Sequence, residues 1–288
     1  MVADLAASFP ARSSPAKLSS ADIFTARSAY DPGTIETHLC SRRDEGKKSL
    51  CCYLMGGMSR DWLDILQAIS HGGANIIEVG IPFSDPMIDG PVIQAASRMA
   101  LDAGATPATV LDEISHVEAG VPLVAMTYYN LLLKGGLSRM AKHMSRARIS
   151  GSIIPDLPPE ESGPWIREAD GSGIENVMLV APTTPVDRAR RICESTRGFV
   201  YCVGTMGVTG ERDSLARTAR EVVAKVMSVT DKPALVGIGV STPAQAAGAC
   251  SVADGVIVGS AIVRRVMEGS GASGVEKFVR SLRDAIDS

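Results

Sequence analysis

The sequence predicts an α/β fold, and within that class a closed (β/α)8 TIM barrel. Three observations favour it: short apolar runs alternate with longer segments of helical periodicity, eight such runs follow residue 48, and each is apolar almost throughout. Strands alternating with helices indicate parallel pairing with the helices outside, and continuously apolar strands are typical of a sheet covered on both faces. Eight units suit a barrel better than an open doubly wound sheet, which commonly has about five to seven strands.

The predicted strands are short runs rich in β-branched or other apolar residues, and each is followed by a turn containing Gly, Pro or Asp. We also expect one helix ahead of the first strand. In chain order, the strands are predicted over residues 49–55, 74–81, 121–129, 150–156, 175–181, 198–204, 233–240 and 254–260.

The segments between the strands carry apolar residues at a period near 3.6, as in 59–73, 187–198 and 214–230, which predicts helices with one buried face. The glycine pair at 72–73 predicts the end of one helix. The sequence STPAQ at 241–245 predicts the start of another, with Ser or Thr at the cap and Pro in the first turn.

Residues 34–288 are predicted to form a single barrel domain, and residues 1–33 a disordered extension, because this extension is rich in Ser, Ala and Pro and has no sustained periodicity. An organelle transit peptide is an alternative, although Asp4, Asp22 and Asp31 are unusual in such peptides. We therefore expect a cytoplasmic protein, or an organelle protein if residues 1–33 are a transit peptide.

The composition narrows the function. With 288 residues and 45% hydrophobic content, the chain can bury a large core. A net charge of −3 without a long Lys/Arg run gives no electrostatic signature of nucleic-acid or anionic-membrane binding. No apolar window approaches the roughly 18 residues of a transmembrane helix. A small, soluble partner or substrate is expected.

The six cysteines include no CxxC pair, and the four histidines show no ligand spacing. Cys51 and Cys52 are neighbours, whose side chains would point to opposite faces of a strand. We predict reduced, mostly buried thiols and no metal site.

Glu78 is an acid inside an apolar strand, flanked by Ile76, Ile77, Val79 and Ile81. Side-chain alternation places it on the face of Ile76, for which the barrel interior is the expected destination. A buried ion pair is one interpretation. The other is a proton-transfer group whose pKa is raised by desolvation, so that it gives and takes a proton near neutrality.

Asp85 and Asp89 lie in the turn after this strand, where Asp before Pro or Gly is also ordinary turn chemistry. The tyrosines near strand ends, Tyr53, Tyr128, Tyr129 and Tyr201, have core packing as their default role. The third strand ends in MTYYN, which offers Met126 and Asn130 as pocket-lining groups.

Glycine-bearing turns follow the last three predicted strands, at 204–210, 237–243 and 258–263. Each is unspecific alone. Together they predict a phosphate site, because bare backbone N–H groups and the start of a helix at Ser260 would face an anion there. No Walker P-loop and no GxGxxG with a following acid is present.

The order of several motifs is more specific. The segment IEVGIPFSDPMIDGPVIQ (77–94), then PDLPPEES, GVTG, GIGVSTP and VGSAIV, closely resembles the tryptophan synthase alpha chain family, from about residue 35 to 287. The resemblance implies a TIM barrel that cleaves indole-3-glycerol phosphate to indole and glyceraldehyde 3-phosphate. This is a retro-aldol lyase reaction of tryptophan biosynthesis without cofactor or metal.

The resemblance also implies roles for individual residues. Glu78 matches the family's acid/base and Asp89 the carboxylate that meets the indole N–H. The positions that match contacts to the indole ring and its surroundings are Tyr53, Ile93, Met126, Tyr201 and Ile238. Thr209 matches a threonine in a loop that closes onto Asp89 in the family. The positions that match phosphate contacts are Gly210, Gly239, Gly259 and Ser260. Residues 204–212 are expected to form a mobile lid.

Asp85 and Pro86 fall where the family contacts its beta chain, the pyridoxal phosphate enzyme that receives the indole in a heterotetramer. The chain departs from the family's pattern in three places. GGMS at 56–59 lacks the Gly-Asp-Pro that is usual there, MIDG at 87–90 occurs where the family usually has LADG, and Thr205 occupies a position where Arg is common. These differences concern the beta-chain interface and its control more than the cleavage.

Three functions therefore remain open from the sequence. The leading one is an indole-producing lyase, either within a tryptophan synthase complex or alone in a specialised pathway. The second is a mainly regulatory alpha-like partner of a beta chain, against which an acid in a barrel strand argues. The third is another sugar-phosphate barrel enzyme such as an isomerase, which the PFSDP loop disfavours.

Overall fold

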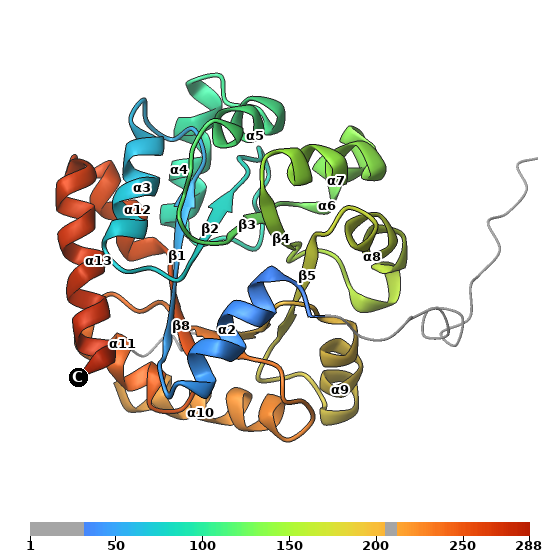
Figure 1. Cartoon of the computed structure of the whole chain (residues 1–288), viewed down its shortest axis with the longest axis vertical. Helices are drawn as coiled ribbons and strands as arrows, with labels where there is room; N and C mark the ends of the chain where they lie inside the picture. The colour runs from blue at the N-terminus through green and yellow to red at the C-terminus, as the bar shows by residue number, and fades with distance from the viewer. Residues whose placement is uncertain (1–31, 205–211) are drawn as a thin grey trace, which may run out of the picture. The chain divides into compact units, whose positions relative to one another are not determined.

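The computed structural model describes residues 32–204 and 212–288, so the expectations for residues 1–31 and 205–211 lie outside it. Eight parallel strands close in sequence order, with β8 beside β1, which confirms the predicted barrel (Figure 1). The strands are β1 (Ser49–Met55), β2 (Ile76–Gly80), β3 (Leu123–Met126), β4 (Ile149–Ile153), β5 (Glu175–Val180), β6 (Val200–Val203), β7 (Ala234–Gly237) and β8 (Gly255–Val258).

Helices connect consecutive strands, and the predicted helix before the first strand is present as α2. The helices of the described residues are α2 (Thr34–Asp44), α3 (Trp62–His71), α4 (Pro91–Asp102), α5 (Pro107–Ser115), α6 (Tyr129–Gly135), α7 (Leu137–Arg146), α8 (Gly163–Asp170), α9 (Val186–Ser195), α10 (Arg212–Met227), α11 (Pro243–Cys250), α12 (Ser260–Met267) and α13 (Gly271–Asp287), with a 3₁₀ turn η1 (Pro159–Glu161).

The predicted end of one helix and the predicted start of another are confirmed. Helix α3 ends just before the glycine pair at 72–73. Helix α11 begins with Pro243 in its first turn, and Thr242 and Gln245 form a capping box at its start. A capping box satisfies two backbone N–H groups that a helix start otherwise leaves unpaired.

Several predicted strands are too long, and the third, fourth and seventh each extend three residues past the observed end. The third strand was expected to continue to residue 129, but β3 ends at Met126 and Tyr129 begins α6. The carboxylate of Asp156, after β4, accepts hydrogen bonds from the Tyr129 N–H at 2.9 and 3.1 Å. Asp156 thus satisfies a backbone N–H group at the start of α6. Because it lies in a distant loop, the residues around Tyr129 do not predict this contact.

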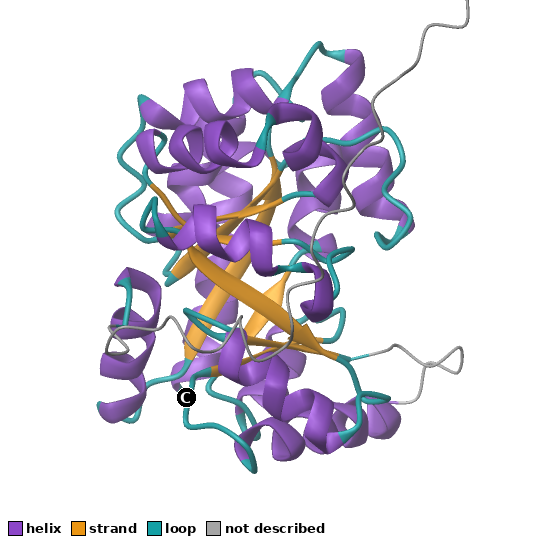
Figure 2. Ribbon diagram, turned by 90° about the vertical axis from the view of Figure 1, so that its right-hand side faces the viewer, coloured by secondary structure: helices purple, strands orange, loops and turns teal. Residues whose placement is uncertain are grey.

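Helices surround the strands (Figure 2). The buried apolar residues form two clusters: a smaller one inside the barrel, called the inner layer here, and a larger one mainly between the strands and the helices, called the outer layer, which also includes Tyr53. Cys51 belongs to the inner layer and Cys52 to the outer layer, as expected for neighbours on a strand. Five of the six cysteines are buried, Cys40 being half-buried. The inner layer consists of Ile35, Leu39, Cys51, Ile76, Val124, Ile153, Val177, Phe199, Leu235 and Ile257.

Helix α2 packs against the amino-terminal end of the barrel. Its Ile35 is fully buried in the inner layer. The carboxylate of Glu175, the first residue of β5, accepts hydrogen bonds from the N–H groups of Ile35 and Glu36, at 2.6 and 3.1 Å. A strand side chain thus caps a helix that lies 140 residues earlier in the sequence.

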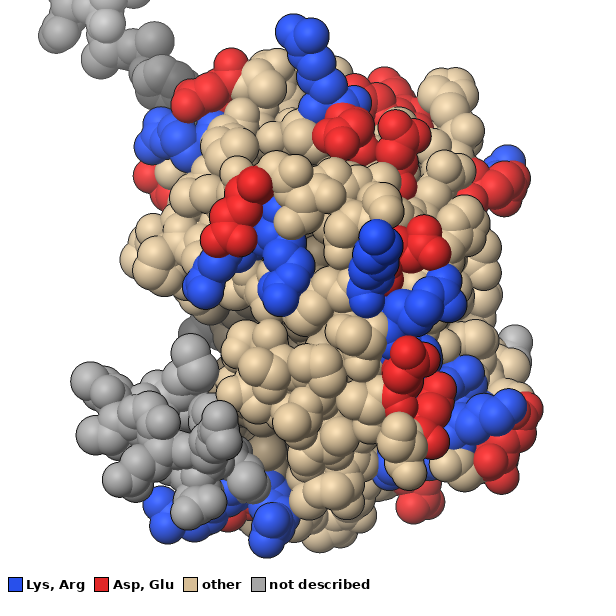
Figure 3. All heavy atoms as spheres, turned by 90° about the vertical axis from the view of Figure 1, so that its left-hand side faces the viewer, with Lys and Arg blue, Asp and Glu red and all other residues tan. Residues whose placement is uncertain are grey.

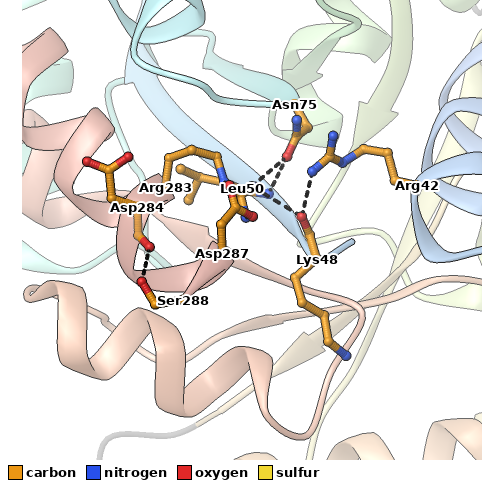
Figure 4. Close-up of polar contacts among 8 residues, drawn as sticks. All are labelled: Arg42, Lys48, Leu50, Asn75, Arg283, Asp284, Asp287 and Ser288. Carbon is orange, nitrogen blue, oxygen red and sulfur yellow. Dashed lines mark hydrogen bonds and ion pairs between the residues drawn. The ribbon is translucent and has the colours of Figure 1, made fainter. Parts of the chain in front are cut away.

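Arg283 of α13 joins the end of the chain to its first strand (Figure 4). Its guanidinium donates to the Lys48 carbonyl and to Asn75 Oδ1, both at 3.1 Å, and it pairs with Asp287 one helical turn later. Asn75 Oδ1 also accepts from the Leu50 N–H at 2.9 Å. The network ties α13, β1 and the start of β2 together at the amino-terminal end of the barrel.

The face that carries α13 shows Lys and Arg interspersed with Asp and Glu, without a continuous field of one sign (Figure 3). Ion pairs on α13, Arg280 with Glu276 and Arg283 with Asp287, contribute to this pattern. No helix among the described residues is both long and apolar enough to cross a bilayer.

We expect Arg283→Met to lower the free energy of unfolding by about 1–3 kcal/mol, because its part-buried charged hydrogen bonds are lost while the apolar stem is retained. Urea unfolding measures the change. Arg264→Met on α12, an exposed arginine, is the control and should change stability by less than about 0.5 kcal/mol. Equal effects of the two substitutions would contradict a stabilising role for the Arg283 network.

Candidate active site

Glu78 lies inside the barrel, as predicted. It is only 2% exposed and is in register with Tyr53 on β1 and Val124 on β3, whose side chain belongs to the inner layer. Its Oε2 atom has no hydrogen-bond partner among the described residues. Burial, and secondarily the nearby charge of Asp89, raise the pKa of Glu78 to about 8.

Asp89 is held at the end of the loop between β2 and α4. The hydroxyl of Tyr128 donates to Asp89 Oδ2 at 3.0 Å, and the Gln94 side-chain amide donates to the Asp89 carbonyl at 2.8 Å. Burial raises the pKa of Asp89, whereas the bond from Tyr128 lowers it. No group among the described residues hydrogen-bonds the second carboxylate oxygen, Oδ1.

Tyr128 is a functional candidate that sequence reasoning assigned to core packing. Its ring does pack, since it is 5% exposed and stacks on Phe83 with ring centroids 5.0 Å apart. Its hydroxyl, however, accepts from the Ile88 N–H at 3.3 Å and donates to Asp89. The sequence shows only that Tyr128 follows a strand end. Its hydrogen-bond partner, Asp89, lies 39 residues earlier, so the local pattern does not reveal this contact.

A small cavity brings several of these residues together at the carboxyl ends of β1, β2 and β3. Asp89, Tyr53, Met126 and Tyr128 line it, together with Pro86. Its position at this end of the strands is the usual place of active sites in barrels. Met126, a predicted ring contact, therefore lies in the same pocket as the predicted carboxylate.

Tyr53 and Tyr201 fit inside the barrel because glycines face them on neighbouring strands. A Cβ atom at Gly80 would overlap with the Tyr53 hydroxyl, and one at Gly237 would lie 2.6 Å from the Tyr201 hydroxyl. Tyr53 Oη has a weak acceptor in Met55 Sδ at 3.9 Å. Burial raises the pKa of both tyrosines, so both remain neutral donors.

Two more predicted ring contacts are apolar and nearly buried. Ile93 on α4 is 8% exposed, and Ile238, directly after β7, is 6% exposed. Gly204 gives Ile238 its space, because a Cβ atom at 204 would overlap with the Ile238 side chain.

The predicted phosphate residues stand after the last two strands. Gly239 has φ +74°, a left-handed conformation that favours glycine. Gly259 is the N-cap of α12, Ser260 is its first residue, and no side chain caps this helix start. Backbone N–H groups at an uncapped helix N-terminus attract anions. Thr209 and Gly210, and the predicted lid, lie outside the described residues.

Asp85 and Pro86 take different positions in the loop after β2. The Asp85 carboxylate is exposed and accepts a hydrogen bond from Ser84 Oγ, so it does not join the pocket, whereas Pro86 lines the pocket beside Asp89. Beyond them, Met87 is 88% and Ile88 56% exposed. Two large apolar side chains at a loop tip are unusual on a free surface and typical of contact regions.

The site combines a proton-transfer group, a fixed carboxylate, an apolar wall and an anion-attracting helix start. These groups suit a ligand with an apolar ring bearing an N–H and a negatively charged end. Within the described parts of the chain, no cluster of three His, Cys, Asp or Glu residues could hold a metal ion. The chemistry that the described side chains offer is acid–base catalysis.

Comparison with known proteins gives a consistent result. The model of the family "Tryptophan synthase alpha chain" matches residues 39–285. The tryptophan synthase alpha chain of Thermobifida fusca is 42% identical over 252 residues, which cover 85% of this chain and 92% of the relative. That of Halorhodospira halophila is 41% identical over 254 residues, covering 85% and 93%.

Solved structures resemble this fold equally well. A structure of Mycobacterium tuberculosis tryptophan synthase has a TM-score of 0.82 and 35% identity, with 89% of this chain and 99% of that chain covered. The tryptophan synthase alpha subunit of Legionella pneumophila has a TM-score of 0.80 and 30% identity, covering 89% and 99%.

The pKa of Glu78 predicts a specific pH dependence of stability. An unfolded Glu ionises near 4.5, but the folded carboxyl near 8. The folded state therefore holds one more proton between these values. The free energy of unfolding should fall across this window, by on the order of 5 kcal/mol, and level off above it.

Urea unfolding of the natural chain and of Glu78→Gln at pH 4, 6 and 9 measures this effect. The variant should become relatively more stable as the pH rises. Glu268→Gln, at an exposed position, is the control and should follow the natural chain. Parallel pH dependence of the natural chain and Glu78→Gln would show that Glu78 does not have a raised pKa.

Proposed function

The chain belongs to the tryptophan synthase alpha chain family, and we propose that it cleaves indole-3-glycerol phosphate to indole and glyceraldehyde 3-phosphate as a carbon–carbon lyase. The observation that carries this proposal is Glu78, a buried acid with a pKa of about 8 whose ionisation is coupled to the charge of Asp89. An acid with this pKa is suited to both accepting and donating a proton at neutral pH.

The retro-aldol reaction needs two proton movements. Indole C3 must gain a proton, which places positive charge on the ring, and the adjacent hydroxyl of the glycerol chain must lose one as its carbon becomes an aldehyde. The electron pair of the broken carbon–carbon bond returns to the ring and restores indole. Glu78 is proposed to mediate these proton movements.

Asp89 is proposed to accept the ring N–H and to stabilise the positive charge that develops on the indole. Tyr128 occupies Oδ2 of this carboxylate, so that Oδ1 is the oxygen proposed to face the ring. We therefore assign Tyr128 as a positioning residue. Tyr53, Ile93, Met126, Tyr201 and Ile238 are proposed to enclose the ring and exclude water.

The phosphate of the substrate is proposed to bind at the start of α12. The uncapped N-terminus at Gly259 and Ser260 supports this assignment, as does the left-handed Gly239. Thr209 and Gly210, which lie outside the described residues, complete the proposed set.

We further propose a beta chain as partner, in a heterotetramer that accepts the indole. The exposed side chains of Asp85, Met87 and Ile88, adjacent to Asp89 in one loop, support this interface. A contact there would adjoin the catalytic carboxylate directly. The six free cysteines, five of them buried, suit a reducing compartment, for which we propose the cytoplasm.

Indole release from indole-3-glycerol phosphate tests the activity, first with the chain alone and then with a beta chain. Glu78→Gln and Asp89→Asn should each lower the rate by about 10²–10⁴, with glyceraldehyde 3-phosphate binding retained. Asp85→Asn is the matched control: it should keep the rate of the isolated chain and weaken stimulation by the beta chain. No indole under either condition from a folded chain that binds the substrate would exclude the lyase function.

Tyr128→Phe tests the positioning role. Loss of a hydrogen bond to a charged group is expected to lower kcat by about 10- to 100-fold. Because that bond lowers the pKa of Asp89, the acidic limb of the pH–rate profile should move to higher pH.

Tyr129→Phe, next to it in the chain, is the matched control and should leave the pH profile unchanged. A lower rate of Tyr128→Phe with an unmoved acidic limb would indicate a packing role for Tyr128 only.

A further inference from the structure

The loop of residues 82–90, between β2 and α4, carries Asp89 and contains no helix or strand. The backbone hydrogen bonds within it join the Met87 N–H to the Asp85 carbonyl at 2.9 Å and the Asp89 N–H to the Pro86 carbonyl at 3.1 Å. Bonds between residues this close in sequence do not fix the loop against the barrel. The position of Asp89 therefore depends on side chains that reach the loop from other elements.

Ser97 of α4 holds the first part of this loop. Its hydroxyl donates to the Phe83 carbonyl at 2.8 Å and accepts from the Phe83 N–H at 2.9 Å, so one side chain binds both backbone groups of one residue. Gln94, three residues earlier on the same side of α4, donates to the Pro86 and Asp89 carbonyls at 3.3 and 2.8 Å. Helix α4 thus holds the loop at two points.

A serine at position 97 is not what the helix itself favours. Ser97 is 1% exposed, and its buried neighbours on α4 include Ala96 and Ala100. Alanine has a higher helix propensity than serine and buries no polar atom. A serine hydroxyl inside a helix commonly bonds a carbonyl of the preceding turn, but this one donates to the loop. The hydroxyl therefore serves the loop rather than the helix.

The Phe83 ring connects this contact to the pocket. It stacks on Tyr128 with ring centroids 5.0 Å apart and an angle of 29° between the planes. The Tyr128 hydroxyl in turn accepts from the Ile88 N–H at 3.3 Å and donates to Asp89 Oδ2 at 3.0 Å. Because a hydrogen bond weakens as its distance and angle change, a shift of the Phe83 ring would weaken the bond to Asp89.

We propose that Ser97 is a positioning residue of the cleavage reaction. By holding the Phe83 backbone it fixes the Phe83 ring, and through that ring it fixes the Tyr128 hydroxyl that orients Asp89. The inference rests on the proposed function, in which Asp89 stabilises the charge on the indole ring. The role of Ser97 is indirect, since it acts through two aromatic side chains.

The pH–rate profile of indole release tests this in Ser97→Ala. We expect kcat to fall by about 3- to 30-fold with little change in KM. The acidic limb should move to higher pH, because the bond from Tyr128 lowers the pKa of Asp89. Ser162→Ala is the matched control: Ser162 is also 1% exposed and donates to a backbone carbonyl, that of Pro159, at 2.8 Å. This variant should keep the natural kcat and profile.

A double-mutant cycle with Tyr128→Phe tests the route of the effect. In that background Ser97→Ala should lower kcat by no more than about twofold, because the hydroxyl through which Ser97 acts is already absent. Phe83→Leu removes the stacked ring and keeps the backbone bonds of Ser97, so it provides the pH-profile test if Ser97→Ala does not fold. An unmoved acidic limb, or equal losses from Ser97→Ala in both backgrounds, would overturn the proposal.

Carbon NMR of the Asp89 carboxyl separates this inference from the lyase function, because it needs no turnover. The resonance is identified by its loss in Asp89→Asn, and its titration should show a higher pKa in Ser97→Ala than in the natural chain. A raised pKa in a chain that releases no indole would contradict the lyase function but not the link from Ser97 to Asp89. Indole release with an unchanged pKa would overturn the positioning role alone.

Discussion

The burial of one carboxyl group, that of Glu78, is the constraint on which the rest of the site depends. A carboxylate inside an apolar barrel loses its hydration, and this loss raises its pKa to about 8. The closed barrel, in which each strand is paired on both sides, tolerates this unfavourable burial. A group that weakens the fold at high pH is thereby turned into one that transfers protons near neutrality.

The two ends of the barrel differ in how their polar groups are hydrogen-bonded. At the amino-terminal end, Glu175 caps α2 and Arg283 donates to carbonyl and amide oxygens, while His38 Nε2 and Arg42 Nε of α2 have no partner among the described residues. At the carboxyl-terminal end, Glu78 Oε2 lacks a partner among the described residues, and the start of α12 lacks a side-chain cap. Stability is concentrated at one end and available binding groups at the other, as is typical of TIM barrels.

Residue patterns predicted the barrel and the interior position of Glu78, because alternation and periodicity are local properties. They did not predict the contacts that depend on the closed sheet. The bond between Tyr128 and Asp89 and the cap that Glu175 provides for Ile35 join residues 39 and 140 positions apart.

The pairing of Tyr53 with Gly80 constrains how this pocket can evolve. Because a Cβ atom at 80 would overlap with the phenol of Tyr53, any larger residue at 80 must be preceded by a smaller one at 53, whereas the reverse order is free. The same asymmetry applies to Tyr201 and Gly237. A wider side chain at either glycine therefore requires the facing aromatic ring to move or to be replaced, so the two positions of each pair set the pocket width together.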